Sequence, residues 1–135
     1  DEVKAIVSNS DVVLDGTDNF LVRKIINRAC VENNKKLIVG AVEGYTGQLM
    51  TMISLESPCY ECIYEDLIDS TSCSDAGVLA PLVGMISSMM ALECINILTG
   101  NNSSFDKKLL VINGLNFSVD SISTKKNQKC KVCNN

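Results

Sequence analysis

Two pairs of cysteines are the residues in this sequence whose types and spacing most plainly predict chemistry. Cys59 and Cys62 form one Cys-x-x-Cys pair, and Cys130 and Cys133 form a second pair near the end of the sequence. Each pair can place two thiolates on one side of a tight turn, and two such turns complete a tetrahedral Zn²⁺ site. The spacing predicts a structural zinc clasp that joins the end of the sequence to its middle.

Disulfide formation and redox chemistry are the alternative uses of these cysteines. Seven cysteines in 135 residues fit a secreted disulfide scaffold, but the odd count, the 46% of apolar residues and the lack of a signal segment favour metal binding. Redox motifs rarely occur as two pairs with one near the terminus. The sequence has no histidine, so a zinc site must use thiolates and no histidine can act as a catalytic base.

Charge and length exclude several classes of protein. The net charge of −4 argues against nucleic-acid binding, which needs clustered basic residues. The one basic cluster flanks the last cysteine pair and is interpreted as a solvated tail: Lys125, Lys126, Lys129 and Lys131. At this length the chain is one domain or part of one, and reduced cysteines without a targeting segment predict a cytoplasmic protein.

A second group of polar residues lies where a strand is predicted to meet a helix. Residues 12–14 are a short apolar run typical of a buried parallel strand, and residues 20–33 carry apolar side chains at helical spacing, namely Leu21, Ile25, Ile26 and Ala29. Between them lies Asp-Gly-Thr-Asp-Asn, residues 15–19. Ligands of open α/β sheets bind at this edge, but Asp18 or Asn19 could equally serve only to cap the helix.

The remaining elements extend this pattern. Residues 37–39 and 48–53 are predicted strands, so the first part of the chain is a βαβ unit followed by a third strand. Residues 63–74 are polar and predicted to be a loop, and residues 76–98 form a long apolar helix. A terminal hairpin follows, with a strand at 109–112, a turn at Asn113 and Gly114, and alternating apolar residues at Phe117, Val119 and Ile122.

The long apolar helix also invites a transmembrane interpretation. Its uncharged stretch, residues 76–92, is shorter than the roughly 20 residues needed to span a bilayer, and it contains Pro81 and Gly84. We therefore expect a buried or subunit-interface helix and no membrane. Cys30 and Cys94 fall on apolar helical faces and are expected to be core residues.

Taken together, these motifs resemble the ThiF/MoeB/HesA family, the ubiquitin-activating-type enzymes that adenylate small sulfur-carrier proteins. The resemblance runs in order along essentially the whole chain, and its segments are 11–20 with Arg23 and Asn27, 44–49, 58–62, 72–84, 91–93 and 130–133. It implies an α/β fold, the C-terminal half of a Rossmann-like ThiF/MoeB fold with a mixed sheet, flanking helices and a four-cysteine zinc clasp.

The sequence departs from this family in one respect. The glycine-rich turn that cradles the nucleotide phosphates in the family, Gly-x-Gly-Gly-x-Gly, has no counterpart here. We therefore expect a single partial ThiF-type domain over 1–135, inactive alone and poor at binding ATP. Its predicted parts are a βαβ portion at 1–56, the first zinc pair and a loop at 57–75, and the long helix, hairpin and second pair at 76–135.

The resemblance also implies roles for individual residues. The family binds ATP and Mg²⁺ and joins the C-terminal carboxylate of a ubiquitin-like carrier to the α-phosphate, giving an acyl-adenylate and pyrophosphate. Asp18 matches the aspartate that holds Mg²⁺, with Asn19 as a neighbouring or capping residue and Arg23 orienting the Asp18 loop. Cys73 matches a loop cysteine that in some members forms a covalent link with the carrier, and an unreactive loop thiol is the alternative.

The implied full-length protein is an adenylyltransferase and a homodimer that acts on a sulfur-carrier partner in thiamine or molybdenum-cofactor synthesis. The alternative is a non-catalytic, zinc-clasped module that docks a ubiquitin-like partner without chemistry. The missing glycine-rich turn keeps this alternative open.

Overall fold

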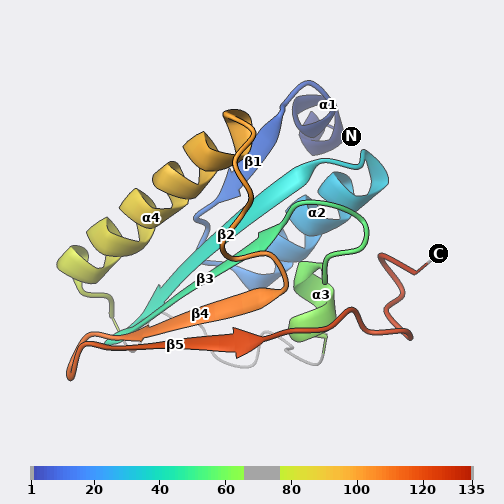
Figure 1. Ribbon diagram of the computed structural model, residues 1–135. Helices are drawn as coiled ribbons and strands as arrows, with labels where there is room; N and C mark the ends of the chain where they lie inside the picture. Colours follow the sequence, from blue (N-terminus) through green and yellow to red (C-terminus); the bar gives the residue numbers. More distant parts are fainter. Residues whose placement is uncertain (1, 66–76, 135) are drawn as a thin grey trace.

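The computed structural model describes residues 2–65 and 77–134, which form a mixed five-stranded sheet with helices on both faces (Figure 1). The elements in chain order are α1 (Glu2–Ser8), β1 (Val12–Asp15), α2 (Phe20–Glu32), β2 (Lys36–Glu43), β3 (Thr46–Met52), α3 (Tyr60–Ile63), α4 (Ala80–Leu98), β4 (Lys108–Asn113) and β5 (Ser118–Ser123).

The strands lie side by side in the order in which they occur in the chain. β1 and β2 are parallel and joined by α2, which confirms the predicted βαβ unit. The pairs β2–β3, β3–β4 and β4–β5 are all antiparallel. β2 extends beyond its predicted end at residue 39 because it turns directly into β3, with Gly44 at φ +53° in the tight connection. The predicted terminal hairpin is β4–β5.

Two hydrophobic layers cover the two faces of the sheet. Figure 1 shows α4 on one side and α1, α2 and α3 on the other. The layer under α1–α3 is formed by Val7, Ala29, Cys30, Leu37, Val39, Met50, Met52, Cys59, Tyr60 and Cys130. The layer under α4 is formed by Ile38, Leu49, Leu82, Ile86, Met90, Ile97, Leu110 and Ile112. The first layer contains two of the paired cysteines, so the predicted clasp is continuous with the core.

Two glycines allow α4 to approach the sheet closely. A methyl group added at Gly47 would lie 2.9 Å from Ile86 Cδ1, and one at Gly40 would lie 2.3 Å from Met90 Sδ. Any larger residue at either position would therefore clash with side chains of α4. The helix begins at Ala80 and not at the predicted residue 76, because Gly77 adopts φ +66° and Val78 bridges to Gly44 before Pro81 enters the first helical turn.

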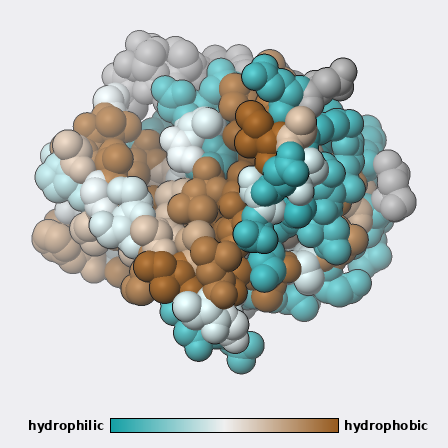
Figure 2. Space-filling model, turned by 90° about the horizontal axis from the view of Figure 1, so that it is seen from above, coloured by the Kyte–Doolittle hydropathy of each residue, from teal (hydrophilic) through white to brown (hydrophobic). Residues whose placement is uncertain are grey.

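Only one face of α4 is covered. By length and composition alone, with a mean hydropathy of 1.6, the helix is able to cross a membrane. In this structure 28% of its most apolar window is buried inside the protein. Packing on the sheet accounts for the inner face, and the expectation of a buried helix therefore holds for that face alone. The outer face exposes Val83, Met85, Leu92, Ile95 and Leu98. In the view from above, apolar side chains gather on the left and centre, the side where α4 lies in Figure 1 (Figure 2).

Several local predictions need correction. The predicted buried strand at 12–14 leaves Leu14 44% exposed, because β1 pairs on one side only within the described part of the chain. On α2, Leu21 and Ile25 are exposed, whereas Arg23 and Asn27 are buried, because these two polar side chains bind backbone groups beneath the helix.

The expectations for the loop and for the single cysteines are only partly met. The predicted loop at 63–74 overlaps α3 by one residue, Ile63, and most of the remainder lies outside the described residues. Of the two cysteines expected in the core, Cys30 is fully buried, but Cys94 is only half-buried.

Candidate metal centre and nucleotide loop

The four paired cysteines come together in space as the sequence predicts. All four sulfur atoms lie within 4.8 Å of one another. The Cys59 sulfur is 3.8 Å from that of Cys62 and 3.7 Å from that of Cys130, and the Cys62 and Cys133 sulfurs are 3.4 Å apart. These four thiols are free, so the sulfurs gather without a disulfide.

These distances suit a tetrahedral zinc ion. With Zn–S bonds of about 2.3 Å, the edge of a regular sulfur tetrahedron is about 3.8 Å. Two of the three close sulfur pairs match that edge within 0.1 Å. Four thiolate donors with no histidine form a donor set that zinc commonly occupies. The residues present therefore fit a structural zinc site.

The sequence supports this cluster from both sides. Cys59 directly precedes the short helix α3. Glu61 of α3 forms a bidentate ion pair with Arg28 of α2, with N–O distances of 2.9 and 3.0 Å. On the C-terminal side, the Asn127 backbone N–H donates to the Cys62 sulfur at 3.4 Å, and the Lys126 ammonium donates to the Leu55 carbonyl at 2.8 Å. The two turns are thus fastened to the body of the protein by contacts that do not depend on a metal.

The protonation of the thiols is set by burial and by their neighbours. Burial raises the pKa of Cys59, and burial together with the Cys62 and Cys130 thiols raises the pKa of Cys133 to about 11. Burial also acts to raise the pKa of Cys130, but hydrogen bonds from the Cys133 and Val132 backbone outweigh it and lower that pKa. Metal binding at neutral pH therefore displaces protons from the cluster.

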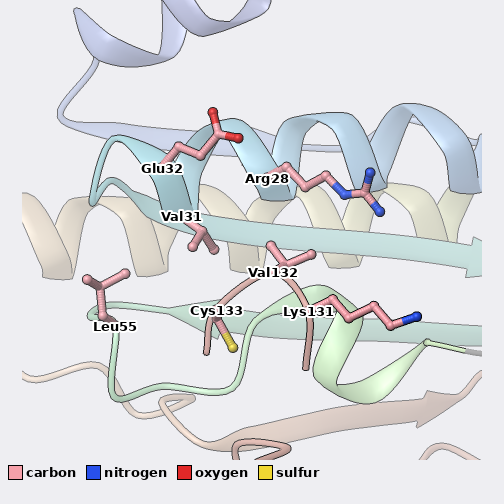
Figure 3. A pocket seen from close by; sticks show the side chains of 7 residues that line it. All are labelled: Arg28, Val31, Glu32, Leu55, Lys131, Val132 and Cys133. Carbon is pink, nitrogen blue, oxygen red and sulfur yellow. The ribbon is translucent and has the colours of Figure 1, made fainter. Parts of the chain in front are cut away.

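A surface hollow of about 490 Å³ adjoins the clasp (Figure 3). Arg28, Val31 and Glu32 of α2 line one side, and the segment containing Val132 and Cys133 lines the other. The Glu32 carboxylate is engaged by Lys4 at 2.6 Å and Arg28 by Glu61, so charged groups on this wall already have partners. None of the lining residues belongs to the loop that carries Asp18.

That loop lies at the carboxyl end of β1 and is fixed at the Thr17 peptide. The buried Asp15 carboxylate accepts hydrogen bonds from the Thr17 N–H at 2.9 Å and from the Thr17 hydroxyl at 2.7 Å. From the other side, the Arg23 guanidinium donates to the Thr17 carbonyl at 2.9 Å through Nε and also reaches the Gly40 carbonyl at 3.3 Å. The peptide groups on both sides of the Thr17 Cα are therefore held, and the backbone entering Asp18 is fixed.

The helix cap is supplied by Asn19 and not by Asp18. The Asn19 side-chain oxygen accepts a hydrogen bond from the Val22 N–H at 3.0 Å. Asp18 is exposed, and its carboxylate makes no hydrogen bond or ion pair with another described residue. The carboxylate thus stands at the sheet edge where ligands of α/β folds bind, with no capping role.

No link between the loop that carries Asp18 and the first cysteine pair was predicted from the sequence. Asn19, Arg23 and Asn27 recur every fourth residue on one face of α2, and Asn27 accepts a hydrogen bond from the Tyr60 N–H at 2.9 Å. The polar residues at helical spacing were the signal that could have revealed this inward face. Cys73, the remaining predicted site residue, lies outside the described residues.

The model of the ThiF family matches residues 1–132 of this chain. The chain belongs to the ThiF family. The predicted fold class is confirmed as well, since the mixed sheet and its helices match a ThiF-type fold.

Curated relatives of this ThiF-family chain are adenylyltransferases. It is 37% identical over 133 residues to the adenylyltransferase and sulfurtransferase MOCS3 of Dictyostelium discoideum, covering 95% of this chain and 31% of the relative. It is 36% identical over 133 residues to the sulfur carrier protein ThiS adenylyltransferase of Escherichia coli, covering 97% and 53%. For the molybdopterin-synthase adenylyltransferase of the same bacterium the identity is 31% over 134 residues, covering 98% and 54%.

A solved structure agrees on the fold. Escherichia coli MccB, in a crystal structure with ATP, superposes with a TM-score of 0.78 at 16% identity, covering all of this chain and 44% of MccB. The ThiF-family chain therefore spans about a third to a half of the length of the proteins it matches.

Proposed function

We propose that this chain is part of an ATP-dependent adenylyltransferase that activates the C-terminal carboxylate of a ubiquitin-like sulfur-carrier protein. One observation carries the proposal: the Asp18 carboxylate stands exposed at the carboxyl end of a parallel strand, in a ThiF-family chain whose relatives adenylate such a carrier. Thiamine or molybdenum-cofactor synthesis is the pathway that the names of the relatives support.

In this proposal the residues of the loop divide the work. Asp18 would hold the Mg²⁺ that accompanies ATP, and the ion would supply charge neutralisation at the phosphates. The carrier carboxylate joins the α-phosphate, and pyrophosphate leaves. Asp15 and Arg23 act by fixing the Thr17 peptide, which holds Asp18 in place. Asn19 caps α2 through its side-chain oxygen, which leaves the amide nitrogen as the group that would donate to a nucleotide phosphate.

Zinc at the four cysteines has a structural role in the proposal. A site filled by four protein sulfurs has no open position for a substrate, so its contribution is to hold the C-terminal segment against α2 and α3. Lys126 and Lys131 lie near the cluster in the chain or in space, and their charges oppose the net charge of −2 that four thiolates and one Zn²⁺ carry. Cys73 remains a candidate for a later thiol step.

Pyrophosphate exchange tests this assignment. In the natural protein that contains these 135 residues, Asp18→Asn should abolish ATP–pyrophosphate exchange in the presence of a carrier and leave the unfolding temperature unchanged. Asp120→Asn is the matched control, since it removes an exposed carboxylate of β5. Full exchange activity in Asp18→Asn would contradict the proposed role.

A non-catalytic docking module is the second candidate function. The observation in its favour is that these residues contain no glycine-rich phosphate-binding turn. The two candidates differ in the same assay, because a docking module would bind the carrier protein without supporting any pyrophosphate exchange.

We also propose that the natural protein is a homodimer in which the outer face of α4 is covered. Leu92, Ile95 and Leu98 are 60%, 56% and 58% exposed on one stretch of helix, which is unusual for the surface of a monomer. Leu92→Lys should yield a monomer in sedimentation equilibrium. Leu115→Lys, at a 67% exposed position of the β4–β5 turn, should leave the dimer intact. A wild-type monomer at high concentration would refute the proposal.

A further inference from the structure

Asn27 lies on the inner face of α2 and is fully buried beside the first cysteine pair. Its side-chain oxygen accepts a hydrogen bond from the Tyr60 backbone N–H at 2.9 Å, and Tyr60 directly follows Cys59. Because a backbone N–H can only donate, the oxygen of the amide must face Tyr60. The orientation of the amide group is thereby fixed, and its nitrogen must point the other way.

The amide nitrogen of Asn27 is a hydrogen-bond donor that lacks an acceptor. Nδ2 of Asn27 is buried and has no hydrogen-bond partner among the described residues. It nevertheless lies beside the first cysteine pair, because the oxygen of the same amide group holds the N–H of the residue that directly follows Cys59. A buried N–H without an acceptor destabilises a fold. An acceptor that forms only when the cysteines bind a metal would explain why this donor is kept at a buried position.

Two of the other three sulfurs already have backbone donors. The Asn127 N–H donates to the Cys62 sulfur, and backbone N–H groups of Val132 and Cys133 reach the Cys130 sulfur. Cys59 is fully buried and faces Cys62 and Cys130 through S–H···S contacts of 3.8 and 3.7 Å. Those contacts need a thiol proton, so they cannot persist once a metal replaces the protons of the cluster.

We propose that Asn27 is a positioning residue of the metal centre, whose Nδ2–H donates to the Cys59 sulfur when that sulfur is a metal-bound thiolate. The inference rests on the proposed metal site. A metal-bound thiolate carries more negative charge than a thiol and is a better acceptor, so the buried donor gains its partner on metal binding. Oδ1 continues to hold the Tyr60 N–H, and one side chain thus fixes both the cysteine turn and its sulfur.

The same helix face then reaches both functional regions. Arg23 lies one helical turn before Asn27 and holds the Thr17 peptide, so α2 spans from the metal centre to the loop that carries Asp18. The separation of Asn19 and Asn27 along the helix axis is about 12 Å. Asn27 therefore fixes the zinc clasp to the element that also fixes the nucleotide loop.

The direct test is NMR of the natural protein loaded with ¹¹³Cd²⁺ in place of zinc. A hydrogen bond from Nδ2 to a metal-bound sulfur should give a scalar coupling between ¹¹³Cd and one Asn27 side-chain amide proton. A role confined to packing or to holding Tyr60 would not produce that coupling. Assigned Asn27 amide protons without any coupling to ¹¹³Cd would overturn the inference, and this measurement requires no variant to fold.

Metal affinity supplies a second measurement. Asn27→Ala should weaken zinc binding by roughly 10- to 100-fold in competition with a chelator, as loss of a hydrogen bond to a metal ligand commonly does. The matched control is Asn33→Ala, which removes an amide bound to the Ala29 carbonyl at 2.8 Å at the end of the same helix. Equal affinities in wild type and Asn27→Ala would contradict the inference.

The two proposals fail in different ways. A wild-type protein that takes up neither zinc nor cadmium would remove the proposed metal site and this inference with it. A wild-type protein that binds one metal ion per chain, but without the ¹¹³Cd coupling, would leave the metal site standing and overturn the role of Asn27 alone.

Discussion

Removal of zinc from the four-cysteine clasp should lower the unfolding temperature of the protein by roughly 10–15 °C. The folded chain holds the four sulfurs within 4.8 Å of one another through its sheet and helices. In the unfolded chain the two cysteine pairs are separated by 71 residues, and bringing them together costs about 4 kcal/mol of loop-closure free energy.

That cost sets the size of the effect. Even if the unfolded chain can bind zinc through all four cysteines, it does so about three orders of magnitude more weakly than the folded chain. Saturating zinc therefore stabilises the fold by about 4 kcal/mol. With an unfolding entropy of about 2.1 cal/mol/K per residue over 135 residues, this corresponds to a shift of about 14 °C.

Differential scanning calorimetry with saturating zinc and with a strong chelator measures this shift. Cys130→Ser should lose most of the response to zinc, since it removes a buried ligand. Cys94→Ser is the control, because Cys94 is a half-buried cysteine outside the cluster. A response to zinc below about 3 °C in the wild type, or an equal loss in the two variants, would refute the reasoning.

Three further predictions concern packing, the nucleotide loop and pH. Gly47→Ala places a methyl group 2.9 Å from Ile86 and should lower the free energy of unfolding by about 1–3 kcal/mol in urea without changing the metal content; a neutral substitution would mean that α4 can move off the sheet. Arg23→Lys loses the planar fork that holds the Thr17 carbonyl and should reduce pyrophosphate exchange by roughly 10- to 100-fold at unchanged zinc content, and full activity would exclude Arg23 from positioning the loop. Burial, with a smaller effect of a nearby carboxylate, raises the pKa of Cys30 from 9.0 to about 12, so its stabilising contribution is complete below pH 9 and is lost as the pH rises through 12. Between pH 9 and 11 the free energy of unfolding should fall less steeply for Cys30→Ala than for wild type in denaturant titrations; equal slopes would show that this thiol does not titrate with folding.

The parts of the fold that the sequence predicts are those in which residue type and period point the same way. The apolar run at 12–14, the helical spacing after it and the apolar run at 37–39 give a βαβ unit, and the structure has it. The cysteine spacing predicted the clasp, because only a few arrangements of two Cys-x-x-Cys turns use all four sulfurs.

The inner face of α2 could not be found in the same way. Leu21 and Ile25 follow the helical period as well as Arg23 and Asn27 do, and hydrophobicity favours burying the first pair. The structure buries the second pair because the carbonyls of Thr17 and Gly40 and the N–H of Tyr60 need partners there. The groups of Gly40 and Tyr60 come from distant parts of the chain, so the local spacing of the polar residues marks a face but does not decide which pair is buried.

The pairing of β3 with β4 and the closure of the cysteine clasp both join distant parts of the chain, across stretches that overlap and are similar in length. Thr46 pairs with Asn113, and Cys59 meets Cys130, while the hairpins β2–β3 and β4–β5 are each made of neighbouring strands. Once either long-range contact forms, the two hairpins are held close together and the other contact no longer requires a long search. Zinc that binds the cysteines early should therefore speed the joining of the two halves of the sheet, and folding of the metal-free chain should be slower at that step.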